Sequence, residues 1–261
     1  MPGPEAADLA LLIAAARAGG AAAMDYWRKP LRQWDKPGAE GPVTEADLAV
    51  NAALAAHLRA ARPGYGWLSE EDPDDGSRHT AEAAFIVDPI DGTRAFAAGQ
   101  DAFAVALAVV RGGAVTAGVV YLPAQGTLYA ASADGPATRD GAPIAPSAAT
   151  APEGARVLTS AGVLAPAHWD GPVPAVTRAF RPSLAWRLCL VAEGRHDAAL
   201  VLRDTWEWDV AAGALIAARA GARVTDRHGA PPRWNAQVPK VAGLLAAPPG
   251  LHAALAGRLR A

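Results

Sequence analysis

Apolar residues recur at helical spacing in two stretches near the N-terminus and predict two helices there. Residues 5–23 are rich in alanine and punctuated by leucine, and we expect a helix that ends at its paired glycines or shortly after them. A second helix begins after Thr44, which can cap it together with Asp47 three residues further on. Apolar residues from Leu48 onward continue this helix until Pro63-Gly64 stops it.

Continuous apolar runs predict strands in the middle of the chain. The run "AFIV" at 84–87 predicts a buried strand. Between 102 and 130, three short apolar runs are separated by glycine and proline turns, which is typical of an antiparallel meander. A polar segment rich in proline and alanine, at about 134–155, is the best candidate boundary, so we expect an N-terminal part at 1–135 and a C-terminal part at 136–261.

The C-terminal part alternates between predicted strands and predicted helices, as α/β sequences do. The expected elements are strands at 156–159, 197–202 and 241–247 and helices at 183–193, 209–220 and the C-terminus. Together with the meander before it, this alternation predicts a fold of mixed α+β and α/β character.

Composition and charge narrow the classes of function. Apolar residues make up 51% of the 261 residues, which is ample for a core. The net charge of -2 provides no field that would recruit nucleic acid or an anionic membrane surface. Strongly apolar runs such as "AFAVALAVV" at 102–110 are shorter than the roughly 20 residues of a membrane helix. We therefore expect no nucleic-acid partner and no membrane partner.

The N-terminus and the only cysteine bear on the compartment. The first residues lack the basic leader of a signal peptide. Cys189 excludes an internal disulfide and lies in the apolar run "LCLVA", where we expect a buried and inert thiol. These features predict a cytoplasmic protein.

Two aspartates, Asp88 and Asp91, stand at the end of an apolar run in the stretch "FIVDPIDGTRAF". Pro89 favours an extended or turn geometry at the residue before it, and Gly92 permits an unusual backbone. Thr93 can cap a short helix that begins there. The stretch therefore predicts a strand, a sharp turn and a helix N-terminus, where backbone N–H groups can bind phosphate.

Carboxylates and phosphate repel each other unless a cation lies between them, and oxygen-rich sites of this kind select Mg²⁺. Asp88 and Asp91 are therefore candidate metal ligands, since a divalent cation makes their burial tolerable. The structural alternative for this motif is a capped turn in which backbone N–H groups satisfy both carboxylates.

Other acidic residues favour the metal site. The stretch "WLSEEDPDDG" supplies Glu70 and Glu71 after a short predicted strand, and "WEWDVAAG" supplies Asp209 at the start of a predicted helix. Taken alone, Asp209 is a helix cap and Glu70 is a loop charge. A calcium loop at 70–75 is disfavoured because Pro73 interrupts it and no glutamate stands where the bidentate ligand is due.

These segments, in this order, resemble the inositol monophosphatase superfamily of Mg²⁺-dependent, lithium-sensitive phosphatases, which includes the 3'(2'),5'-bisphosphate nucleotidases. One family signature, an apolar pair followed by D-P-[IL]-D-G-T, stands here as "FIVDPIDGT", and another, W-D-x-A-A/G, stands as "WEWDVAAG". The helix motif "VTEADLAVN" and the "SEED" loop also match, so the resemblance covers essentially the whole chain. It implies the layered αβαβα sandwich of inositol monophosphatase and fructose-1,6-bisphosphatase, and an Mg²⁺-dependent phosphomonoesterase.

The resemblance also implies roles for individual residues. Asp47 and Thr93 would activate the attacking water, and Glu70 would share in catalysis. About two to three Mg²⁺ ions would occupy the site. The implied metal ligands are Glu70, Asp88, the Ile90 carbonyl, Asp91 and Asp209. The implied substrate-binding residues are Asp91, Gly92, Thr93, Arg187 and Asp209.

Arg187 favours the nucleotidase branch. It stands where the nucleotidases resemble one another in carrying a lysine and where inositol phosphatases tend to carry a neutral polar residue, and a cation there suits a second phosphate. The expected substrate is then 3'-phosphoadenosine 5'-phosphate. The alternative is that Arg187 only extends along its helix toward solvent. Trp186, Trp206 and Trp208 could stack on an adenine, although tryptophans more often belong to the core.

Other readings of the family resemblance remain open. Inositol 1-phosphate, histidinol phosphate and fructose 1,6-bisphosphate are alternative substrates. A non-catalytic, metal-binding interaction protein is the alternative from another class, and it would be expected to have lost a metal ligand or the Asp47 and Thr93 pair. The partner expected from the family is a small phosphomonoester, and a homodimer is the expected assembly.

Overall fold

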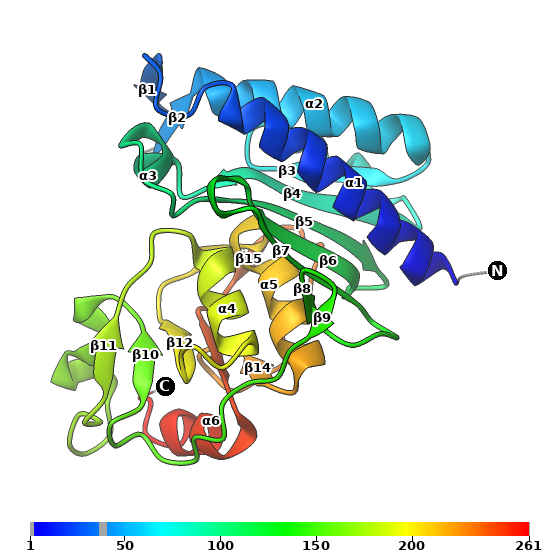
Figure 1. The fold of residues 1–261 in the computed structure, drawn as a ribbon. Coiled ribbons are helices and arrows are strands. Elements are labelled where there is room, and N and C mark those ends of the chain that lie inside the picture. The colour runs from blue at the N-terminus through cyan, green and yellow to red at the C-terminus, as the bar shows by residue number, and fades with distance from the viewer. Residues whose placement is uncertain (1–2, 37–40, 261) are drawn as a thin grey trace.

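One outer layer of the molecule consists of two helices that pack side by side on one face of a sheet (Figure 1). The computed structural model describes residues 3–36 and 41–260. The two helices are α1 (Pro4–Met24) and α2 (Glu45–Ala61), and both confirm the helices predicted from the spacing of apolar residues.

Helix α2 begins with the predicted cap. The Thr44 side chain accepts a hydrogen bond from the Asp47 N–H, and the Asp47 side chain accepts one from the Thr44 N–H. The predicted apolar face is wrong at Leu48, which is exposed, whereas Val50 and Leu54 are fully buried. Helix α2 packs against α1 and strand β4, and those contacts select which apolar residues become core.

Helix α1 is more apolar as a whole than its short apolar runs indicate. Its 21 residues reach a hydropathy of 1.4 over an 18-residue window, so by length and composition it could cross a membrane. Its buried residues include Leu12, Ala15 and Ala16, which pack into the core between α2 and the sheet. The core helix of a globular protein meets the same criteria, so this helix is weak evidence for a membrane span.

The central sheet has seven strands in the order β3-β4-β5-β6-β7-β8-β9, with β3 parallel to β4 and the other neighbours antiparallel. Its strands are β3 (Gly66–Ser69), β4 (Ala83–Asp91), β5 (Ala104–Arg111), β6 (Ala114–Leu122), β7 (Thr127–Ser132), β8 (Thr138–Arg139) and β9 (Ala142–Pro143). These strands confirm the predicted meander and the strand at 84–87. The pairing of β4 with β5 shifts register between Asp88 and Asp91, so the ladder is irregular where the two aspartates stand.

Two helices form the layer behind this sheet, followed by a second sheet and a last helix (Figure 1). The helices are α4 (Leu184–Ala192) and α5 (Glu207–Ala220), and the last helix is α6 (Pro249–Ala256). The second sheet has the order β11-β10-β12-β16-β14, with β10 (Arg156–Leu158), β11 (Thr177–Ala179), β12 (Ala198–Val201), β14 (Arg223–Thr225) and β16 (Leu244–Ala247). The predicted αβαβα sandwich is confirmed.

Several short elements were not predicted. The strand predicted at 241–247 is divided into β15 (Lys240–Val241) and β16 by Gly243, which has a positive φ of 68°. Strands β11 and β14 have three residues each, too few to show a periodic pattern. The short helix predicted at Thr93 is α3 (Thr93–Ala97). The elements that were not predicted also include β1 (Gln33–Asp35), β2 (Pro42–Thr44), β13 (Thr205–Trp206) and the 3₁₀ helices η2 (Ser77–His79), η3 (Pro123–Gln125), η4 (Ala161–Leu164) and η5 (Pro166–His168).

The core between the sheets joins the two halves of the chain. Helices α4 and α5 approach so closely that a Cβ on Gly213 would lie 2.8 Å from the Leu188 Cβ. Buried residues of α5, such as Val210, share one apolar cluster with residues of β5, such as Ala106. The division at residue 135 stays a prediction, and the central sheet continues past it through β8 and β9.

A buried network of charged residues around Asp8 provides a test of stability. Asp8 is 1% exposed, and its carboxylate accepts hydrogen bonds from Arg62 Nε at 3.0 Å, Arg111 Nη2 at 3.1 Å and the Tyr65 hydroxyl at 3.0 Å. We expect Asp8→Ala to lower the free energy of unfolding by roughly 1 to 3 kcal/mol, because these donors lose a buried acceptor. Urea denaturation measures the change. Glu82→Ala is the matched control, since Glu82 also pairs with Arg111 but is exposed, and an equal loss there would contradict the account.

Candidate active site

Strand β4 delivers two carboxylates to one end of the central sheet. Asp88 and Asp91 lie in its last four residues and are almost fully buried. The chain then turns sharply at Gly92, which has a φ of +100°. A Cβ on this residue would lie 3.0 Å from the Ala102 carbonyl oxygen, so both the backbone conformation and the space favour glycine here.

The Thr93 hydroxyl is directed toward Asp47 rather than toward the start of α3. Gly92 is the N-cap of α3 and no side chain caps the helix, so the predicted capping role of Thr93 is wrong. Thr93 Oγ1 lies 3.2 Å from Asp47 Oδ1 and 3.1 Å from the Ile90 carbonyl oxygen, and both of these oxygens can accept its single proton. The other Asp47 oxygen accepts hydrogen bonds from the N–H and hydroxyl of Thr44.

Burial controls the acidity of Asp47. Desolvation raises the pKa of this carboxyl above its ordinary value, and the charge of Glu70 raises it further, while the hydrogen bonds from Thr44 and Thr93 lower it. The structure therefore brings together the two residues expected to activate water, a buried Asp47 and a half-buried Thr93 joined by a hydrogen bond.

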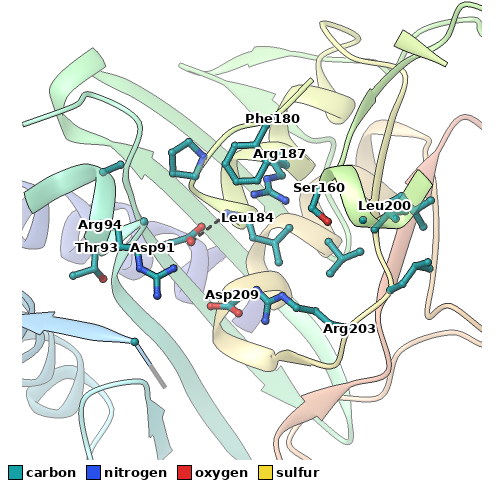
Figure 2. Close-up of a pocket in the computed structure, with 18 of the residues that line it drawn as sticks. Asp91, Thr93, Arg94, Ser160, Phe180, Leu184, Arg187, Leu200, Arg203 and Asp209 are labelled. Atoms are coloured by element: carbon teal, nitrogen blue, oxygen red, sulfur yellow. Dashed lines mark hydrogen bonds between the residues drawn. The ribbon is translucent and has the colours of Figure 1, made fainter. Parts of the chain in front are cut away.

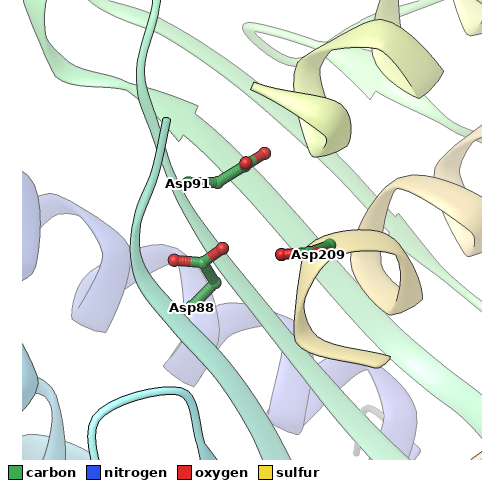
Figure 3. A group of neighbouring side chains, drawn as sticks. All are labelled: Asp88, Asp91 and Asp209. Carbon is green, nitrogen blue, oxygen red and sulfur yellow. The ribbon is translucent and has the colours of Figure 1, made fainter. Parts of the chain in front are cut away.

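Three carboxylates from distant parts of the chain meet beside this pair. Oxygens of Asp88, Asp91 and Asp209 all lie within 4.8 Å of one another, and Figure 3 shows the three side chains converging from β4 and the start of α5. Both oxygens of the Asp88 carboxylate are buried, and neither accepts a hydrogen bond from the described residues. A buried carboxylate of this kind is strongly unfavourable unless a cation balances it.

Asp91 differs from Asp88 because the start of α4 holds it. Its carboxylate accepts hydrogen bonds from Ser183 Oγ at 2.6 Å, the Ala185 N–H at 2.7 Å and the Leu184 N–H at 3.2 Å. Ser183 also caps α4 by accepting a hydrogen bond from the Trp186 N–H. The structural alternative, a carboxylate satisfied by backbone N–H groups, therefore describes part of the role of Asp91 but none of the role of Asp88.

Burial raises the pKa values of these three carboxylates, and for Asp88 and Asp209 the repulsion of neighbouring carboxylates adds to it. Burial is the largest cause for Asp88, and the charges of Glu70, Asp91 and Asp209 add to it, so its pKa lies well above the ordinary value. Burial and the charge of Asp91 have the same effect on the pKa of Asp209. Burial raises the pKa of Asp91 to about 6, although the donors of α4 oppose the shift. A cluster of hard carboxylate oxygens that repel one another fits a divalent cation such as Mg²⁺.

Glu70 lies in the turn after β3 and contacts a residue that the sequence pattern did not indicate. Lys36 Nζ donates to Glu70 Oε1 at 2.9 Å, to Glu71 Oε1 at 2.8 Å and to the Glu70 carbonyl at 3.3 Å. The close cluster of the other three carboxylates does not include Glu70, although its charge acts on Asp88 and Asp209. Lys36 was missed because an isolated lysine in a short loop carries no sequence signal.

A buried network positions the start of α5, which carries Asp209. Glu207 is fully buried and accepts hydrogen bonds from the N–H groups of Asn235 at 2.7 Å and Ala236 at 3.0 Å. The same two residues receive the guanidinium of the buried Arg78, through the Asn235 side chain and the Ala236 carbonyl. The network joins the segment after Glu70 to the helix that supplies Asp209.

Asp91, Thr93 and Asp209 line one large pocket, which Figure 2 shows. Its volume is about 1110 Å³, and its wall includes Glu70, Asp91, Gly92, Thr93, Arg187 and Asp209. Four further arginines that sequence reasoning missed also line it: Arg94, Arg203, Arg227 and Arg260. The pocket is therefore lined by both carboxylates and arginines.

Arg187 faces this pocket from α4 and is 8% exposed. Its Nε donates to the Arg181 carbonyl at 2.6 Å, and its guanidinium lies 4.3 Å from the centre of the Phe180 ring. Burial lowers its pKa to about 10, which still leaves it charged at neutral pH, while the charge of Asp91 opposes this shift. Among the described residues, no carboxylate forms an ion pair with Arg187.

The three tryptophans considered for base stacking do not line the main pocket. Trp206 and Trp208 stack on each other with ring centres 4.6 Å apart. Trp186 lines a smaller neighbouring pocket of about 560 Å³. Cys189 is buried as expected, and burial raises the pKa of its thiol well above the ordinary value, consistent with an inert residue.

Comparison with known proteins agrees with this geometry. The profile of the inositol monophosphatase family matches residues 6–261. The Escherichia coli 3'(2'),5'-bisphosphate nucleotidase CysQ is 32% identical over 199 residues, which cover 73% of this chain and 78% of the relative. The inositol-1-monophosphatase of Rhizobium meliloti is 34% identical over 223 residues, or 82% of each chain. The structure of the extragenic suppressor protein suhB from Bartonella henselae superposes with a TM-score of 0.82 at 25% identity, covering 96% of this chain and 97% of that one.

The layered fold and the buried carboxylate cluster define a metal-dependent phosphatase that acts on small phosphorylated substrates. The chain belongs to the inositol monophosphatase family.

Proposed function

We propose that this protein hydrolyses a phosphomonoester with Mg²⁺ held by Glu70, Asp88, the Ile90 carbonyl, Asp91 and Asp209. The observation that carries the proposal is the buried Asp88 carboxylate, which accepts no hydrogen bond within the described part of the chain. Four carboxylates bring four negative charges, so two Mg²⁺ ions would leave the site neutral and three would leave two positive charges for a dianionic phosphate. About two to three ions therefore suit this ligand set.

The chain's own residues orient the water and the phosphate. When the Thr93 hydroxyl donates its proton to Asp47, its oxygen is left to accept a hydrogen bond from the attacking water. The N–H groups of Gly92 and Thr93 stand at the start of α3, on the pocket wall, where they can bind phosphate oxygens. Bound Mg²⁺ would supply the remaining chemistry, by lowering the pKa of that water and stabilising the charge on the phosphoryl group and leaving oxygen.

For the substrate we propose 3'-phosphoadenosine 5'-phosphate. Arg187 is buried beside the pocket that Asp91 and Asp209 line, and within the described residues it has no ion-pair partner, so it favours an anionic ligand. The second phosphate of a bisphosphate nucleotide would supply that anion. The resemblance to the Escherichia coli nucleotidase gives further support.

Inositol 1-phosphate is the second candidate substrate, and the relative from Rhizobium meliloti favours it. Histidinol phosphate has no second phosphate for Arg187 and is less well supported. Fructose 1,6-bisphosphate does have one, so only the assay separates it from the nucleotide. Comparing phosphate release from all four substrates with Mg²⁺ present tests the assignment. Preference for inositol 1-phosphate would contradict the nucleotidase proposal and leave the phosphatase class unchanged.

We expect Arg187→Ala to lower kcat/KM for 3'-phosphoadenosine 5'-phosphate by about ten- to a hundredfold. A charge-assisted hydrogen bond to the second phosphate is worth about 1.5 to 3 kcal/mol, which corresponds to this loss. Inositol 1-phosphate has no second phosphate, so its hydrolysis should change little. Arg187→Lys is the matched control and should retain part of the activity because it keeps the charge. Equal losses on both substrates would show that Arg187 acts on the fold rather than on the phosphate.

A further inference from the structure

Apolar side chains line part of the pocket that Arg187 faces. Phe180 stands just after β11 on the pocket wall, and 48% of its surface is exposed, so its ring is accessible to a ligand. Leu184, Leu200 and Val163 line the same pocket from α4, β12 and η4. Figure 2 shows Phe180 beside Arg187, with Leu184 and Leu200 in the same wall.

These side chains discriminate between classes of leaving group. An inositol ring carries hydroxyl groups on every side, and each one loses hydrogen bonds to water when it is placed against aliphatic carbon. A heteroaromatic base has two apolar faces and polar groups only at its edge, so a wall of this kind can contact it without leaving polar groups unsatisfied. The large pocket volume of about 1110 Å³ also exceeds what a phosphate and one sugar ring fill.

We infer that Phe180 and the aliphatic wall formed by Val163, Leu184 and Leu200 form a subsite for the flat base of a nucleotide substrate, with Phe180 as its stacking residue. The inference rests on the proposed nucleotidase function and adds the residues that select a base. Arg187 links the binding of the second phosphate to the binding of the base. Its guanidinium covers part of the Phe180 ring, and its charge acts on Asp91. The second phosphate and the base therefore bind side by side, on Arg187 and Phe180.

The test compares two bisphosphates that differ only in the base. The substrates are 3'-phosphoadenosine 5'-phosphate and its abasic analogue, 1-deoxyribose 3,5-bisphosphate, each assayed by phosphate release. Wild-type enzyme should prefer the nucleotide by about five- to a hundredfold in kcat/KM, the range measured for stacking of one base on an aromatic residue. Phe180→Ala should remove most of this preference through a higher KM for the nucleotide, while the abasic analogue changes less than about twofold.

The controls separate stacking from effects on Arg187 and on the fold. Phe180→Tyr keeps the aromatic ring and should keep the preference, whereas Phe180→Leu keeps an apolar side chain and should lose it. Because both substrates carry the second phosphate, equal losses on both in Phe180→Ala would mean that the residue acts through Arg187, and this would overturn the inference. An unchanged preference for the nucleotide in Phe180→Ala would also overturn it while leaving the nucleotidase function in place. If wild-type enzyme hydrolyses inositol 1-phosphate but neither bisphosphate, both the inference and the proposed function are overturned.

Discussion

Asp88→Asn is expected to lower kcat/KM by roughly a thousandfold or more, for every substrate that the wild-type enzyme hydrolyses. The substitution keeps the shape of the side chain but removes the charge that the proposed metal site needs, and the rate of phosphoryl transfer depends mainly on such electrostatic stabilisation. Phosphate release at saturating Mg²⁺ measures the loss. Turnover close to wild type would show that the metal ligands are wrongly assigned.

The same variant should be more stable than wild type when a chelator removes all divalent metal. The folded-state pKa of Asp88 is raised by burial and by its carboxylate neighbours. Between the unfolded pKa of about 4 and this raised value, the native state binds more protons than the unfolded state, so the stability of metal-free wild type falls as pH rises. Asparagine has no such proton to lose. We therefore expect Asp88→Asn in chelator at pH 7 to unfold at a higher temperature than wild type.

Asp8→Asn is the matched control for this stability test, because Asp8 is also a buried carboxylate but its partners are all protein groups. It should lower the unfolding temperature with or without Mg²⁺, and it should leave catalysis at saturating Mg²⁺ unchanged. A lower unfolding temperature for Asp88→Asn in chelator would contradict the view that its charge is uncompensated.

Thr93→Ala and Asp47→Asn are expected to lower kcat by about a hundred- to ten thousandfold with little change in KM. This is the range for removal of a group that activates a nucleophile, and the effect belongs to the transition state rather than to substrate binding. Steady-state kinetics with Mg²⁺ separates the two parameters. Thr93→Ser keeps the hydroxyl and should retain most of the turnover. A rise in KM with kcat intact would assign both residues to binding.

The pH profile should report the state of Asp47. Burial raises the pKa of this carboxyl, and only its ionised form can accept the proton of the Thr93 hydroxyl. Turnover should therefore fall as pH decreases through the raised pKa, at a higher pH than for a solvent-exposed aspartate.

Much of the site could be predicted from the sequence, because its residues occupy short motifs with a strict local geometry. Asp88 and Asp91 follow an apolar run and precede a glycine, and that pattern reflects a buried strand that ends in a sharp turn. Thr44 and Asp47 form a capping box, which depends only on residues three apart. Asp209 lies in the first turn of a helix that was predicted from its apolar residues. The helix starts at Glu207, two residues before its predicted position.

Contacts between segments distant in sequence were not predictable in the same way. The Thr93 hydroxyl turns toward Asp47, 46 residues away, instead of capping its own helix. Lys36 approaches Glu70 and Glu71 only because the fold places their loops together. The exposure of Leu48 also depends on which neighbours the packing supplies. A single sequence contains no signal for such pairings.

The most direct test of the central claim is to titrate Mg²⁺ into chelator-treated protein while measuring bound Mg²⁺ and released phosphate in the same samples. We expect no phosphate release before Mg²⁺ is added, and recovery of activity as about two to three ions bind per wild-type chain. In Asp88→Asn we expect weaker Mg²⁺ binding and no recovery of activity. Phosphate release in chelator, or full activity in Asp88→Asn with wild-type Mg²⁺ binding, would contradict the claim.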